Sequence, residues 1–122
     1  MKVIRGSERQ KEHADELKDH FTGRARRHAL HETREPTGSA FIHFEAGARN
    51  HWHSHAGGQV LVIVEGEAHV QASGAPVETL KAGDTAIAPP GEKHWHGATA
   101  GTSMTHLAVT SGEITWYEEA PS

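Results

Sequence analysis

The chain has 122 residues, a length that suits one domain, so we expect a single domain over residues 1–122. Twelve Lys and Arg against 16 Asp and Glu give a formal net charge of −4, which argues against a general nucleic-acid binder because such a protein needs a basic face. No cysteine is present, no apolar run could cross a bilayer and no secretory pattern opens the chain, so we expect a cytoplasmic protein whose metal, if any, has nitrogen and oxygen ligands.

The polar first third of the chain predicts one short helix. Ser7 and Gln10 form a capping-box pattern, and the segment from Glu8 to His20 is rich in helix formers, so we expect a surface helix that ends near Gly23. A basic cluster follows, and we interpret it as a solvated face: Arg24, Arg26, Arg27 and His28.

From residue 38 onward, short apolar segments alternate with Gly and Pro. We predict strands at residues 39–44, 60–64, 68–72, 77–81, 85–88, 94–96, 104–110 and 114–117. Many short strands with regular turn signals are typical of an all-β sandwich or barrel. No helical crossover pattern supports a parallel α/β sheet.

Histidine is unusually abundant, with 12 in the chain. His51, His53 and His55 alternate, so in an extended strand their side chains share one face. Gln59 lies beyond a Gly-Gly turn, so its amide oxygen can return toward the same point. Two imidazoles on one face can reach a single ion, and neutral imidazole is the commonest metal ligand in proteins.

A second pair, His94 and His96, has the same spacing behind a Pro-Gly turn. Any one histidine taken alone is more often a surface or core residue. Two such pairs together with a Gln in an all-β chain favour a metal site.

Two spaced motifs in this region resemble those of the cupin superfamily. The first motif is matched by Gly47, His53, His55, Gln59 and Gly66. The second is matched by Gly83, Pro89, Gly91 and His94. Gln59 replaces the usual carboxylate of the first motif, and Ala98 replaces the Asn that often closes the second. The resemblance covers about residues 39–110. It implies a jelly-roll-like small β-barrel, open at one end, with metal ligands His53, His55, Gln59 and His94.

The segments Pro90–Ala98 and Met104–Ala108 are similar to small single-domain cupins that include manganese-dependent bacterial hydroxynitrile lyases. That resemblance implies one divalent transition metal per chain, with Mn(II) favoured. Nitrogen and oxygen ligation suits Fe(II), Co(II), Ni(II) and Zn(II) as well. Because three imidazoles and an amide are all neutral, the ion would keep its full charge, which favours Lewis-acid chemistry over redox cycling.

His96 and His106 are the candidate catalytic residues. His96 shares a face with His94, and His106 shares one with Met104 and Ala108, so both are expected to look into the barrel and to act as general bases or to orient the metal ligands. The expected substrate pocket consists of Ala40, Ile42, Phe44, Leu61 and Thr110. We expect His43 to face away from the site and His51 to lie outside the ligand set. The remaining histidines are assigned to the surface: His13, His20, His28, His31 and His69.

Three functions remain open for a small-molecule substrate. The first is a lyase that cleaves and forms cyanohydrins, the second a metal-dependent dioxygenase, and the third a non-catalytic binding protein. A barrel of this size with apolar edges also predicts a homodimer, with a tetramer as the alternative.

Overall fold

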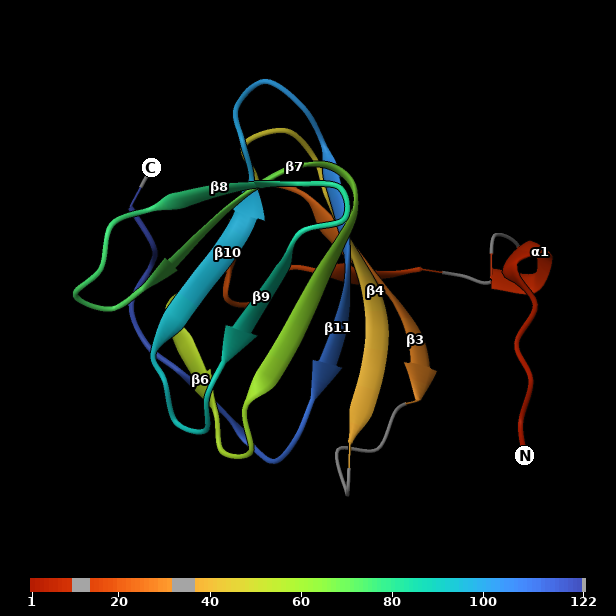
Figure 1. Cartoon of the computed structure of the whole chain (residues 1–122). Helices are drawn as coiled ribbons and strands as arrows, with labels where there is room; N and C mark the ends of the chain where they lie inside the picture. The colour runs from red at the N-terminus through yellow and green to blue at the C-terminus, as the bar shows by residue number, and fades with distance from the viewer. Residues whose placement is uncertain (10–13, 32–36, 122) are drawn as a thin grey trace.

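The computed structural model describes residues 1–9, 14–31 and 37–121, and the all-β fold predicted from the sequence is confirmed (Figure 1). The described elements are α1 (Gly6–Arg9), β1 (Asp15–Leu17), β2 (Phe21–Thr22), β3 (Ala25–His31), β4 (Gly38–Phe44), β5 (Arg49–Asn50), β6 (His53–His55), β7 (Gln59–Ala72), β8 (Glu78–Lys81), β9 (Thr85–Ala88), β10 (His94–Ala98), β11 (Met104–Thr110) and β12 (Ile114–Trp116). No described helix is long and apolar enough to cross a membrane.

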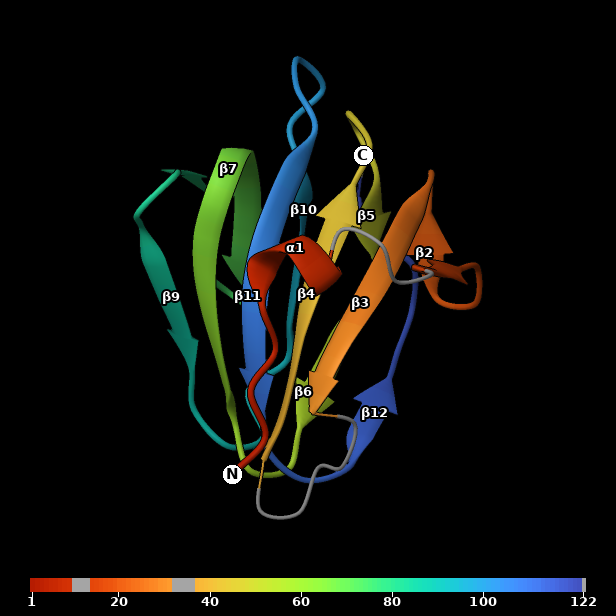
Figure 2. The ribbon, with the colours of Figure 1, turned by 90° about the vertical axis from the view of Figure 1, so that its right-hand side faces the viewer.

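Two antiparallel sheets form a nearly closed barrel. The first contains β1, β3, β4, β11, the first half of β7, and β9, and Figure 2 shows several of these strands side by side. The second contains β2, β5, β10, the second half of β7, β8, β6 and β12. The long strand β7 therefore belongs to both sheets.

Strict alternation along β4 and β11 divides inner from outer residues. Ile42 pairs with His106 and Ala40 pairs with Ala108, and these four side chains point inward. Phe41 pairs with Leu107 on the outer face. Because side chains two apart share a face, one apolar set fills the barrel and the other coats its outside.

The apolar core occupies one end of the barrel. Phe44, Ile63 and Met104 are fully buried there, packed among alanines of both sheets. The opposite ends of the same strands carry Gln59 and Thr110, which are paired in register. The barrel thus has a packed end and an end at which polar side chains gather.

Two predicted strands, 60–64 and 68–72, are in fact one strand. Gly66 was read as the break between them, but it lies within β7 with φ 80°. A Cβ at this position would lie 1.9 Å from the carbonyl oxygen of Ser103, so only glycine allows β11 to approach so closely. An irregularity in the β7–β11 register beside Thr105 and His106 bends the strand at this point, where it passes from one sheet to the other.

The predicted helix over residues 8–20 is wrong for most of its length. Helix α1 ends at Arg9, residues 10–13 lie outside the described part of the chain, and Asp15–Leu17 forms β1. β1 pairs antiparallel with β3, and this non-local pairing overrides the local helix propensity of the segment.

The basic cluster is not a uniform solvated face. Arg26, Arg27 and His28 lie on β3, which the sequence did not predict, and all three are half-buried. Arg26 points outward, 3.3 Å from Glu45, whereas Arg27 lines the interior cavity described below. Because successive side chains of a strand point to opposite faces, basic residues that are adjacent in the sequence do not form one charged surface.

Candidate metal centre

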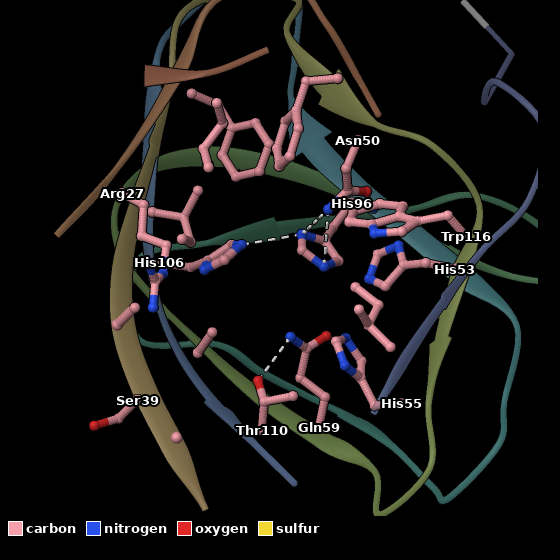
Figure 3. A pocket seen from close by; sticks show the side chains of 18 of the residues that line it. Arg27, Ser39, Asn50, His53, His55, Gln59, His96, His106, Thr110 and Trp116 are labelled. Atoms are coloured by element: carbon pink, nitrogen blue, oxygen red, sulfur yellow. Dashed lines mark hydrogen bonds between the residues drawn. The ribbon is translucent and has the colours of Figure 1, made fainter. Parts of the chain in front are cut away.

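Three strands bring the predicted metal ligands together. β6 carries His53 and His55, β10 carries His94, and Gln59 is the first residue of β7 (Figure 3). His94 pairs directly with His53 across β10 and β6, so their side chains stand next to each other. Pairing between these strands thus brings the two H-x-H motifs together.

The imidazole rings form a compact buried cluster. The ring centroid of His53 lies 4.4 Å from that of His94 and 5.0 Å from that of His55, and His55 lies 5.7 Å from His94. Nitrogen atoms of His53, His94 and His96 all fall within 4.8 Å of one another, close enough to hold one metal ion. The structure therefore contains a three-histidine site that could bind a divalent metal.

Backbone carbonyls fix the tautomers of two of these rings. Nδ1 of His53 donates to the carbonyl of His51 at 2.8 Å, and Nδ1 of His94 donates to the carbonyl of Glu92 at 3.0 Å. Each neutral ring then presents an unprotonated Nε2 on its other side. This arrangement is the usual one for metal-binding histidines, whose second nitrogen is held by a hydrogen bond.

The contact between His94 and Gln59 tests whether the site fits a metal ion. Nε2 of His94 lies 2.9 Å from Oε1 of Gln59, while Nε2 of Gln59 donates to Oγ1 of Thr110 at 3.2 Å. With Nδ1 of His94 carrying the hydrogen, both atoms of the short contact are acceptors. Burial lowers the pKa of His94, which disfavours a second proton on the ring. A metal ion bound by both atoms satisfies them, so this donor set fits a divalent metal.

His96 and His106 form a second buried pair beside this cluster. Nε2 of His106 lies 3.0 Å from Nδ1 of His96. Asn50 holds the His96 ring: its Oδ1 accepts the backbone N–H of His96 at 2.9 Å, so its Nδ2 faces both ring nitrogens at 3.2 Å. Within the described chain, Nδ1 of His106 has no hydrogen-bond partner.

Burial keeps these imidazoles neutral. It is the main cause that lowers the pKa of His53 to about 3, with a smaller contribution from His94, and it lowers the pKa of His106 to about 4. The pKa of His96 also lies well below 6.5, again chiefly because of burial. A neutral ring keeps an unprotonated nitrogen that can bind a metal at physiological pH.

We expect acid to unfold the metal-free protein. In the unfolded chain a histidine has a pKa near 6.5 and is protonated below that pH. In the folded protein, His53 and His106 stay unprotonated down to about pH 3 to 4. These two histidines therefore leave the free energy of unfolding unchanged above pH 6.5. Between pH 6.5 and 4, each of them should lower it by about 1.4 kcal/mol per pH unit. Urea denaturation at pH 7, 6 and 5 measures this, and equal stability at all three values would contradict it.

A cavity of about 150 Å³ opens beside the cluster. Its wall includes four of the five predicted pocket residues: Ala40, Ile42, Phe44 and Thr110. His53, His55, Gln59, His96 and His106 also line it. Leu61 is not among the residues of this wall. Its side chain is buried, but it borders a neighbouring cavity next to Ala86 and Ala88 of β9, and His94 borders the same neighbour.

Several lining residues were missed by the sequence reasoning: Leu17, Phe21, Arg27, Asn50, Ile114 and Trp116. Phe21 and Leu17 had been placed on the predicted helix, and their apolar character was the available signal. Asn50 directly precedes the alternating histidines in the sequence, and that position was the available signal for it. Trp116 packs against His53 at 4.9 Å between ring centroids, which no local pattern indicates.

The other histidines differ in their exposure. His43 faces the outside, where its Nδ1 is 2.8 Å from Oγ1 of Thr105. His20 is exposed and stacks on Trp116 at 4.4 Å. His31 is exposed yet reaches the cavity edge, and His28 and His69 are half-buried; His13 lies outside the described residues.

This barrel and its histidine cluster define a cupin, and comparison with known proteins agrees. The family model described as "Cupin domain" matches residues 40–111, so the chain belongs to the cupin family. The chain is also 44% identical over 93 residues to a protein named (R)-mandelonitrile lyase from Granulicella tundricola, a match that covers 75% of this chain and 71% of that protein.

Solved structures give the same fold. A cupin-like protein of Thermotoga maritima superposes with a TM-score of 0.82 at 34% identity and covers 87% of this chain and 85% of its own. An RmlC-like cupin of Shewanella frigidimarina, at 24% identity, superposes with a TM-score of 0.70 over 85% of this chain and 86% of its own, which supports the fold alone.

Proposed function

We propose that this cupin is a metal-dependent lyase that cleaves cyanohydrins such as mandelonitrile into an aldehyde and hydrogen cyanide, and that also runs the reverse addition. The observation that carries the proposal is the pair of neutral imidazoles, His96 and His106, 3.0 Å apart beside the metal cluster. The 44% identity to a mandelonitrile lyase supports the same choice.

We propose His53, His55, Gln59 and His94 as the metal ligands. His96 lies as close to the cluster, but its ring nitrogens already face Asn50 and His106 at 3.2 and 3.0 Å. A divalent ion held there, with Mn(II) favoured, would supply Lewis-acid polarisation of a hydroxyl or carbonyl oxygen.

The histidine pair moves the protons. Cleavage requires the substrate hydroxyl to lose its proton, the bond between the carbinol carbon and the nitrile carbon to break, and the departing cyanide to gain a proton. Nδ1 of His106 is suited to accept the first proton, because it has no other partner in the described chain. His96, joined to His106 by a hydrogen bond, is placed to donate the second.

The cavity suits the rest of such a substrate. Ala40, Ile42 and Ala108 give it apolar walls of small and medium side chains, and Phe44 closes the end near the core. Its volume of about 150 Å³ resembles that of a protein cavity known to bind benzene. An aryl group can therefore be held out of water while its hydroxyl reaches the polar end.

The test is mandelonitrile cleavage by metal-loaded protein in the absence of oxygen. We expect turnover well above the metal-free background, without oxygen uptake. Activity only with oxygen and an aromatic diol would favour the dioxygenase alternative. Thermal stabilisation by ligands without any turnover would favour the binding alternative.

We also propose that the chain forms a homodimer through the outer face of the first sheet. Phe41, Leu107, Val62 and the 73% exposed Ile87 lie on this face, and such an apolar surface is normally covered. Light scattering at micromolar concentration should give twice the chain mass. Ile87→Asp should shift it toward the monomer, whereas Val77→Asp, an exposed apolar position on the turn between β7 and β8, should not. A tetramer, or a monomer in the unaltered protein, would contradict the proposal.

A further inference from the structure

Arg27 is placed unusually for an arginine, on the inner face of the barrel. It pairs with Ile42 of β4, which in turn pairs with His106 of β11, so the three residues form one row across the sheet. Adjacent strands lie about 4.8 Å apart, which puts the backbone of Arg27 roughly 10 Å from that of His106. Both side chains line the same cavity as the metal cluster (Figure 3).

The cavity holds no counter-charge for this guanidinium. Among the described residues that line it, Arg27 is the only one with a permanent charge, and no carboxylate is present. Arginine stays protonated at any physiological pH, so the cavity carries a net positive charge even before a metal ion is added.

The neighbouring arginines show the contrast. Arg24 lies 2.9 Å from Glu16, and Arg26 lies 3.3 Å from Glu45. In the described part of the chain, no ion pair joins Arg27 to any carboxylate. This includes Asp15, its exposed register partner on β1.

We propose that Arg27 binds a carboxylate on the substrate, so that the preferred substrates are small hydroxy compounds that carry a carboxylate group. A guanidinium pairs with a carboxylate through two parallel hydrogen bonds, which fixes orientation as well as charge. The inference rests on the proposed function to the extent that the hydroxyl of the same molecule reaches the metal cluster. It narrows the substrate class from neutral cyanohydrins to anionic ones.

Benzoate and benzamide test the charge preference, because they share size and shape and differ in charge. Their affinities for metal-loaded protein can be compared by calorimetry. We expect benzoate to bind at least about tenfold more tightly in the unaltered protein. Arg27→Met should reduce that ratio to near one with unchanged metal content, and Arg27→Lys should keep part of it. Arg26→Met is the matched control, because this neighbour points outward, and it should leave the ratio unchanged.

Two results would overturn the inference: a ratio near one in the unaltered protein, or a ratio that persists in Arg27→Met, as direct metal binding by benzoate would give. The proposed lyase function fails separately. If the charge preference depends on Arg27 but mandelonitrile is not cleaved, the lyase proposal falls and the carboxylate site stands. If mandelonitrile is cleaved but Arg27→Met leaves the ratio unchanged, the carboxylate site falls and the lyase proposal stands.

Discussion

Replacing His94 with alanine is expected to remove the metal and, with it, the lyase activity. His94 presents its unprotonated Nε2 to the cluster and lies 2.9 Å from Oε1 of Gln59, so it connects the second H-x-H segment to the other proposed ligands. Residues that merely orient a metal ligand contribute 10- to 100-fold in affinity, so loss of a ligand should cost at least on that order. Elemental analysis of protein purified without added metal should give about one first-row ion per unaltered chain and almost none in the variant.

His69→Ala is the matched control for this experiment. His69 lies on β7, pairs with Gly97 of β10, and is half-buried away from the cluster. Its replacement should leave metal content and activity intact. Full metal occupancy in His94→Ala would refute the ligand assignment while leaving the cupin fold unaffected.

Replacing His106 with alanine is expected to lower the rate of mandelonitrile cleavage on the order of 10² to 10⁴, the usual contribution of a general base. The side chain is completely buried, and its Nδ1 has no partner among the described residues and is therefore available to accept the substrate proton. Metal content should not change, because His106 contacts His96 and not the proposed ligands.

His106→Gln guards against a trivial loss of folding. The longer amide fills more of the space next to Phe44 than alanine does and can hydrogen-bond to His96, but it cannot accept a proton. We expect it to be as inactive as His106→Ala, with thermal stability closer to that of the unaltered protein. Activity within threefold of the unaltered rate in either metal-loaded variant would exclude His106 as the base.

The fold was largely predictable because its signals are local. Glycine and proline punctuation marked the strands from residue 38 onward, and period-two alternation placed Ala40, Ile42 and Phe44 on one inner face. The first third was not predictable in this way. β1 forms because it pairs with β3, and β3 forms because it also pairs with β4; the helix-forming residues of this segment show none of that pairing.

The sequence predicted only the part of the site that follows from the spacing of residues along one strand. Alternation places the two histidines of each H-x-H motif on one face, but the meeting of the motifs depends on the register of His94 against His53, which is a non-local property. The same limit applies to Arg27. It lies in a run of basic residues whose other members do not line the cavity, and only its position opposite Ile42 shows that it points inward.

The sharing of β7 between the two sheets has a consequence for how the barrel opens. Residues 59–62 pair with both β9 and β11, and residues 68–70 pair with both β8 and β10, so each half of one continuous strand is held on both sides. Neither sheet can unfold without breaking hydrogen bonds to this strand. Amide hydrogen exchange along β7 should therefore proceed through global unfolding rather than local fraying, which makes it the slowest-exchanging segment of the chain.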